Sequence, residues 1–294
     1  MLSKGAAILV DGASAMARKL NVPEIIIGLT IVACGTSAPE AAVSISSVIQ
    51  GSSGVGVGNI LGSNIANILL ILGVSALITN LYVHKNTVFY EIPFVAFISV
   101  LLMFLGWQYG AVYRGGALIL FVLFLLFLVY LFFMARNQKD EVHEIENMST
   151  AKMIMFVLFG IVALVIGAKI TVNSAVDIAR ALNISERVIG LTVIAFGTSL
   201  PELLTCIVAA IKKRSDLVIG NIIGSNIFNI LFVLGITGLI KPIPFENAFL
   251  VDSVWGVVAA VLLWIFVVHD RKLTKSEGLL FLILYSVYVV SLIR

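Results

Sequence analysis

GLTIVACGTSAPE at residues 28–40 and GLTVIAFGTSLPE at residues 190–202 are two copies of one segment, identical at nine of 13 positions. VGNILGSNIANILLILG at 57–73 matches IGNIIGSNIFNILFVLG at 219–235 at 12 of 17 positions. One offset of 162 residues relates both pairs without an insertion. Self-similarity at a fixed offset indicates an internal repeat, so the two halves of the chain are expected to share one fold.

The composition is that of a membrane protein. Of 294 residues, 60% are hydrophobic and 12% charged, and the mean hydropathy is +1.11. Soluble domains are about half apolar and a quarter charged, which excludes a soluble enzyme. The net charge of +3 lies in loops and does not indicate a nucleic-acid partner. No cofactor and no obligatory protein partner is expected; the lipid bilayer is the environment.

Apolar runs and breakers predict ten spans. They are 5–20 (incomplete), 24–49, 57–79, 88–107, 115–135, 152–180, 186–210, 217–240, 247–268 and 277–293. Five crossings separate the two GTS-x-PE motifs, so the copies point in opposite directions. This predicts an all-α polytopic membrane protein of two inverted five-helix repeats, a transporter architecture. We expect repeat 1 at 1–135, a short cytoplasmic linker at 136–151 and repeat 2 at 152–294.

The two halves differ at the first span. The apolar run Lys152–Ile166 precedes Gly167, whereas only Met1–Lys4 precede its counterpart Gly5. The first helix is therefore expected to be about half length, through an upstream start or a shortened form. The linker carries acidic residues that would form a solvated loop or, alternatively, a regulatory cation site. They are Asp140, Glu141, Glu144 and Glu146.

Two glutamates stand inside apolar spans. Glu40 and Glu202 each follow a proline, Pro39 or Pro201. Proline removes a helical N–H, and the carbonyl that it frees belongs to the glycine of each GTS triplet. Broken backbone at membrane depth is tolerated where it lines a cavity, and a charge at the bilayer centre costs about 2.5–3.5 kcal/mol. The pair indicates a cation path; a protonated, hydrogen-bonded glutamate pair is the structural alternative.

A polar stripe accompanies the glutamates. Positions i, i+4 and i+8 share one helix face, and in each repeat they hold an asparagine, a serine and an asparagine. The two sets are Asn59, Ser63, Asn67 and Asn221, Ser225, Asn229. Gly58/Gly62 and Gly220/Gly224 form GxxxG pairs, which let helices approach closely. The stripe serves ion binding, ordinary interhelical hydrogen bonding, or both.

The donor set suits a hard cation. Ca²⁺ prefers 6–8 oxygen ligands from carboxylates, carbonyls and amides. Softer transition metals prefer thiolate or imidazole. Here Cys34 and Cys206 lie singly in apolar segments, and His84, His143 and His269 fall in predicted loops. The membrane core therefore predicts an oxygen-only site.

GTSAPE with GNILGSNIAN, repeated as GTSLPE with GNIIGSNIFN, resembles the two alpha-repeats of the calcium/cation antiporter superfamily, and most of all its prokaryotic sodium/calcium exchangers. The resemblance implies a ten-helix fold, a prokaryotic cell membrane, and exchange of Ca²⁺ for Na⁺ by alternating access. It also implies the ligand roles. Glu40 and Glu202 match Ca²⁺ carboxylates; Thr36 and Thr198 match carbonyl ligands; Ser37, Ser199, Ser63, Ser225, Ala33 and Ala195 match Na⁺-site positions; Asn67 and Asn229 match the flanking polar pair.

Several alternatives remain open. The H⁺/Ca²⁺ branch tends to carry an acid in its GNxxE-type helices, which this chain lacks. Some relatives, including K⁺-dependent exchangers, have aspartate at the position of Asn229; the neutral residue here predicts exchange that does not need K⁺. A cation channel would use the same acids. An intramembrane protease with Ser37 or Ser199 as nucleophile lacks a basic partner in the core.

The basic residues predict the orientation. If the amino terminus lies outside the cell and the linker inside it, the cytoplasmic loops hold more Lys and Arg residues than the outer loops do. The inner set is Arg18, Lys19, Lys85, Arg136, Lys139, Lys152, Lys212, Lys213, Arg214, Arg271, Lys272 and Lys275; the outer set is Arg114, Arg180, Arg187, Lys241 and Arg294.

Overall fold

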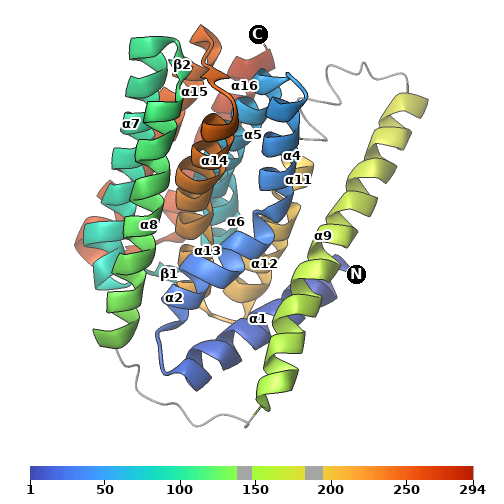
Figure 1. Ribbon diagram of the computed structural model, residues 1–294. Helices are drawn as coiled ribbons and strands as arrows, with labels where there is room; N and C mark the ends of the chain where they lie inside the picture. The colour runs from blue at the N-terminus through green and yellow to red at the C-terminus, as the bar shows by residue number, and fades with distance from the viewer. Residues whose placement is uncertain (138–147, 183–194, 294) are drawn as a thin grey trace.

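The computed structural model describes residues 1–137, 148–182 and 195–293 (Figure 1). The acidic linker residues, Arg187 and the beginning of the second GLT segment lie outside these ranges, so predictions about them stay untested.

Repeat 1 is helical almost throughout. Its elements are α1 (Leu2–Leu20), α2 (Glu24–Ile27), η1 (Gly28–Val32), α3 (Ala33–Thr36), α4 (Ala38–Ile49), α5 (Ser53–Ile65), η2 (Ala66–Leu72), α6 (Gly73–Ile78), β1 (Leu81–Tyr82), η3 (Thr87–Glu91), α7 (Ile92–Tyr109), β2 (Ala111–Val112) and α8 (Arg114–Asn137). The η elements are π-helical turns that continue the α-helices beside them.

Repeat 2 follows the same order. Its described elements are α9 (Thr150–Ala181), α11 (Ala195–Thr198), α12 (Leu200–Ile211), α13 (Ser215–Ile227), η5 (Phe228–Val233), α14 (Leu234–Ile240), β3 (Ile243–Pro244), α15 (Asn247–Asp270), β4 (Lys272–Leu273) and α16 (Lys275–Ile293). In the described ranges, seven helices are long and apolar enough to cross a membrane. A further pair, Glu24–Thr36 and Ala38–Ile49, passes the same test together and is bent by 49°, so the described ranges have up to eight spans if this pair crosses as one. The predicted all-α membrane fold is confirmed.

Two short strand pairs join the repeats at their loops. β1 pairs with β4, and β2 pairs with β3, both antiparallel. At the 162-residue offset, β1 corresponds to β3 and β2 to β4, so each ladder joins a loop of one repeat to a loop of the other. This reciprocal pairing is what an inverted duplication requires, because equivalent loops then lie on opposite sides of the bundle.

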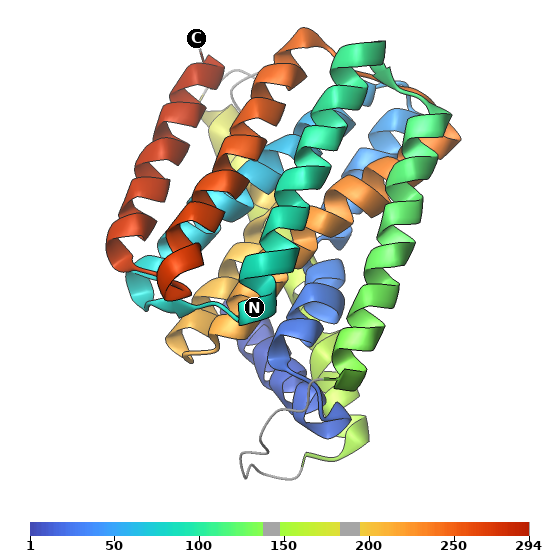
Figure 2. The same cartoon turned by 90° about the vertical axis from the view of Figure 1, so that its left-hand side faces the viewer.

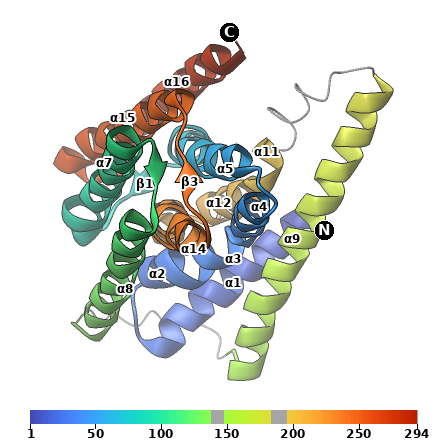
Figure 3. The same ribbon diagram turned by 45° about the horizontal axis from the view of Figure 1, so that its top comes forward.

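The helices that carry the repeated motifs occupy the middle of the bundle. Figure 3 shows α4, α5, α12 and α14 surrounded by longer helices, and Figure 2 shows α16, α15, α7 and α8 on the face towards the viewer. The most apolar window of Ser215–Ile240 is 94% buried, whereas that of Lys275–Leu292 is 17% buried. The polar stripe therefore lies in the protein interior, and the outer helices present apolar side chains to lipid.

α1 and α9 cross each other at one side of the bundle (Figure 1). Small residues allow the close approach: a Cβ on Gly160 would lie 2.7 Å from the Cβ of Leu9. As predicted, α1 is the shorter helix. α1 begins at Leu2, which corresponds to Leu164 at the 162-residue offset, whereas α9 already begins at Thr150.

Candidate ion-binding site

Each GTS-x-PE segment forms a break between two short helices. α3 ends at Thr36 and α4 begins at Ala38, with Ser37 outside the helical region at φ −81° and ψ 6°. Pro39 lies in the first turn of α4, where its missing N–H costs little. The second copy has the same break at Ser199, between α11 and α12. The prolines thus stand at the beginning of new helices, α4 and α12.

The break places each glutamate in the first turn of a helix. Glu40 lies there in α4 and Glu202 in α12. The partial positive charge of a helix N-terminus favours an anion. Both glutamates are only 1% exposed, and a buried negative charge is costly unless it is paired. A cation bound to them would offset this cost.

The serines of the two breaks bind the glutamates crosswise. The Ser37 hydroxyl donates to Oε1 of Glu202 at 2.8 Å, and the Ser199 hydroxyl donates to Oε1 of Glu40 at 3.1 Å. Ser199 also contacts the hydroxyl of Ser63 at 3.2 Å. Each carboxylate is therefore held by the opposite repeat, and three of the predicted serines, Ser37, Ser199 and Ser63, come together with the two glutamates.

The threonines bind the first asparagine of each stripe. Thr36 donates to Oδ1 of Asn221 at 3.0 Å, and Thr198 donates to Oδ1 of Asn59 at 3.3 Å. Asn59 in turn donates to the main-chain carbonyl of Glu40 at 3.3 Å. For Asn59 and Asn221, interhelical hydrogen bonding is the role that the structure shows.

The second asparagine of each stripe belongs to a group of four amides. Asn67 and Asn229 lie at the start of π-helical turns, η2 and η5, which often occur at functional sites. They hydrogen-bond to Asn226 and Asn64. Asn64 and Asn226 are outside the predicted set, although both belong to a GSN triplet repeated at the 162-residue offset. That repetition was the available signal.

Within the described ranges, five buried oxygens of this region have no hydrogen-bond partner. They are Oε2 of Glu40, Oε2 of Glu202, Oδ1 of Asn67, Oδ1 of Asn229 and the hydroxyl of Ser225. An unsatisfied buried polar group costs about 1–3 kcal/mol. Carboxylate, amide and hydroxyl oxygens are ligands that Ca²⁺ accepts. The donor set therefore fits a hard cation.

The predicted alanines differ from the other site residues. Ala33 is buried, and its carbonyl accepts from the Ser37 amide at 3.0 Å. The Thr36 hydroxyl lies 3.3 Å from the same oxygen, but its single O–H is shared with the closer Oδ1 of Asn221 at 3.0 Å, so the Ala33 carbonyl keeps acceptor capacity for an ion. Ala195 is the first residue of α11, and its side chain lies outside the described part.

A third buried glutamate lies apart from this group. Glu91, at the end of η3, is 1% exposed and accepts a hydrogen bond from the Tyr130 hydroxyl on α8. Its Oε2 has no hydrogen-bond partner among the residues that the structure describes. The sequence does not single it out, because Glu91 stands near the start of a span, where an acid is usually solvated.

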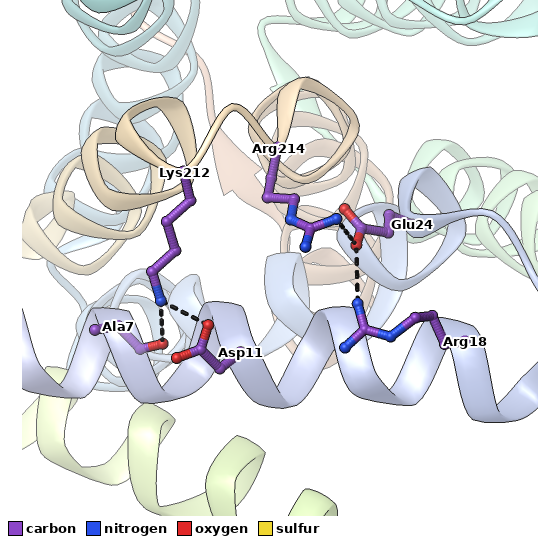
Figure 4. Close-up of polar contacts among 6 residues, drawn as sticks. All are labelled: Ala7, Asp11, Arg18, Glu24, Lys212 and Arg214. Atoms are coloured by element: carbon purple, nitrogen blue, oxygen red, sulfur yellow. Dashed lines mark hydrogen bonds and ion pairs between the residues drawn. The ribbon is translucent and has the colours of Figure 1, made fainter. Parts of the chain in front are cut away.

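Ion pairs tie α1 and α2 to the turn between α12 and α13 (Figure 4). Lys212 contacts Asp11 at 2.6 Å and also donates to the carbonyl of Ala7 at 3.3 Å. Arg214 and Arg18 both approach Glu24, at 3.2 and 3.9 Å. The Lys212–Asp11 pair is exposed and contributes roughly 0–1 kcal/mol, whereas the Glu24 side chain is partly buried at 15% exposure.

Comparisons with known proteins agree with this architecture. The inner membrane protein YrbG of Escherichia coli is 36% identical over 87% of this chain and 83% of its own length. The sodium/calcium exchanger MaX1 of Methanosarcina acetivorans is 34% identical, covering 99% of this chain and 95% of its own.

A solved structure shows the same fold. The sodium-calcium exchanger NCX_Mj, soaked with 2.5 mM Na⁺ and 0.1 mM Ca²⁺, superposes with a TM-score of 0.87 at 34% identity, covering 99% of this chain and 94% of that one. The family model described as sodium/calcium exchanger protein matches residues 1–133 and 152–294. The broken helices, the crosswise serine–glutamate contacts and these matches together lead to one conclusion: the chain belongs to the sodium/calcium exchanger protein family, whose members are transporters and not enzymes.

Proposed function

We propose that this chain exchanges Ca²⁺ for Na⁺ across the cell membrane by alternating access. The observation that carries the proposal is the set of unpartnered acceptor oxygens on and beside Glu40 and Glu202. In this proposal the two carboxylates bind Ca²⁺ together with main-chain carbonyls at the helix breaks. The serines around them serve the Na⁺ sites, and Asn67 and Asn229 flank the bound ion with their amide oxygens.

Two formal negative charges match one Ca²⁺. The same carboxylates attract Na⁺ ions that compete for the region, because each Ser37–Glu202 or Ser199–Glu40 contact leaves one carboxylate oxygen available. Competition for a shared set of oxygens is the physical basis of exchange, since binding one ion disfavours the other.

Burial supports alternating access over a channel. Both carboxylates are 1% exposed, so a bound ion would leave only after helices around it move. Exchange through one enclosed site requires that the site open to one side at a time. A conducting pore would require continuous access from both sides.

Purified protein in proteoliposomes tests the proposal. Ca²⁺ uptake is measured under an outward gradient of Na⁺, of K⁺ or of H⁺, each imposed separately. We expect the Na⁺ gradient alone to drive uptake. Uptake driven by H⁺ instead would indicate an H⁺/Ca²⁺ antiporter, a requirement for K⁺ would indicate a K⁺-dependent exchanger, and unitary currents would indicate a channel; each contradicts the proposal.

A further inference from the structure

We infer that Asn64 and Asn226 are positioning residues, which turn the side-chain oxygens of Asn67 and Asn229 towards the ion. This inference rests on the proposed function of the site. A primary amide has an oxygen at one end and an NH₂ at the other. Only the oxygen attracts a cation, so the orientation of each amide decides whether it serves as a ligand.

The side chain of Asn64 hydrogen-bonds to the opposite repeat. Its Nδ2 donates to the main-chain carbonyl of Asn226 at 3.4 Å. A main-chain carbonyl only accepts hydrogen bonds, so Asn64 must turn its NH₂ towards it. The opposite orientation would place two oxygens against each other in a buried position, because Asn64 is 6% exposed.

The orientation of the Asn64 amide determines that of the Asn229 amide. With its NH₂ engaged, Asn64 presents Oδ1, which accepts from Nδ2 of Asn229 at 3.1 Å. Asn229 must therefore turn its own NH₂ towards Asn64. Its Oδ1 is left without a partner and buried.

The other repeat contains the same chain of contacts. Nδ2 of Asn226 donates to the main-chain carbonyl of Asn64 at 3.2 Å. Oδ1 of Asn226 accepts from Nδ2 of Asn67 at 2.9 Å, which leaves Oδ1 of Asn67 unpartnered. Each series of hydrogen bonds begins at a main-chain carbonyl of the opposite repeat. Replacing the side chain of Asn64 or Asn226 therefore leaves the carbonyl at which the other series begins in place.

The two free oxygens belong to segments that pack against the glutamate helices. η2, with Asn67, contacts α12 of Glu202, and η5, with Asn229, contacts α4 of Glu40. An aspartate at 229 has no N–H for Oδ1 of Asn64. The contact with Oδ1 of Asn64 therefore requires a donor at position 229, and the amide of Asn229 supplies it.

Double-mutant cycles test the inference. The Ca²⁺ KM is measured in proteoliposomes for Asn64→Ala alone, in the Asn229→Ala background and in the Asn67→Ala background. We expect Asn64→Ala alone to raise the KM about tenfold, the effect of losing one well-aimed ligand oxygen. In the Asn229→Ala background, Asn64→Ala should not raise the Ca²⁺ KM further. In the Asn67→Ala background, it should raise the KM as much as it does alone.

Asn226→Ala is the matched control from the other repeat. Its effect on the Ca²⁺ KM should vanish in the Asn67→Ala background and persist in the Asn229→Ala background. A structural role would affect both backgrounds alike, so equal effects in the two, or no effect of Asn64→Ala alone, would overturn the inference. If the alanine variants are not monodisperse in detergent, Asn64→Leu and Asn226→Leu, which fill the space, complete the same cycles.

Wild-type uptake distinguishes a failure of the proposed function from a failure of the positioning role. No Na⁺-driven Ca²⁺ uptake by the wild type would overturn the proposed function and this inference with it. Normal wild-type exchange without background-selective coupling would overturn only the positioning role.

Discussion

Exchange by this protein should be electrogenic, and the size of the effect follows from the charges in the site. Glu40 and Glu202 carry two formal negative charges, and Asn67 and Asn229 add none. One Ca²⁺ makes the occupied site neutral. About three Na⁺, the number that the family resemblance implies, leave one positive charge, and a charge crossing the membrane is worth about 2.3 kcal/mol per 100 mV.

This energy sets the expected gradient. Since about 1.4 kcal/mol is a factor of ten, a clamp of 100 mV should change the equilibrium Ca²⁺ accumulation about 50-fold. Each cycle that takes up Ca²⁺ moves one net positive charge outwards with Na⁺. A positive interior therefore favours uptake, and a negative interior favours Ca²⁺ exit with Na⁺ entry.

The assay uses proteoliposomes loaded with Na⁺, with valinomycin and K⁺ gradients setting the potential. Ca²⁺ uptake should be faster at a positive interior than at zero or negative potential, and protein-free liposomes give the leak. A rate and an accumulation that are indifferent to the potential would refute the charge count. Uptake without valinomycin should not need K⁺, because Asn229 supplies no extra carboxylate; an absolute K⁺ requirement would show that this reasoning from Asn229 is wrong.

Three further predictions concern single residues. Glu40→Gln or Glu202→Gln should abolish Ca²⁺ exchange with folded protein retained, since a neutral amide is cheaper to bury; unchanged uptake by Glu202→Gln would remove that residue from the site. Gly224→Ala places a Cβ 2.6 Å from a main-chain carbonyl of η1 and should destabilise by about 1–3 kcal/mol, measured as a lower melting temperature in detergent, whereas Gly256→Ala, with open space around it, should not. A cysteine replacing Asn137 should resist an impermeant thiol reagent in intact cells; ready labelling would reverse the predicted topology.

The sequence alone determined the architecture, because duplication and hydropathy are properties of the chain itself. The repeated GTS-x-PE motif identified Glu40 and Glu202 as equivalent, and the odd number of crossings between them predicted the inversion. Proline next to each glutamate predicted a broken helix, and the structure has breaks at Ser37 and Ser199. The shorter first helix was also visible from the repeat comparison.

Only the tertiary structure decided how the residues are used. The stripe pattern treats Asn59 and Asn67 alike, yet Asn59 binds the neighbouring helices while Oδ1 of Asn67 stays unpartnered. The π-helical turns, the burial of Glu91 and the contacts of Asn64 and Asn226 were likewise not predicted. A repeat offset shows which residues are equivalent, but not which ones touch. Contacts such as Ser37 with Glu202 join residues 165 positions apart, and their geometry is set by how the two inverted halves pack against each other.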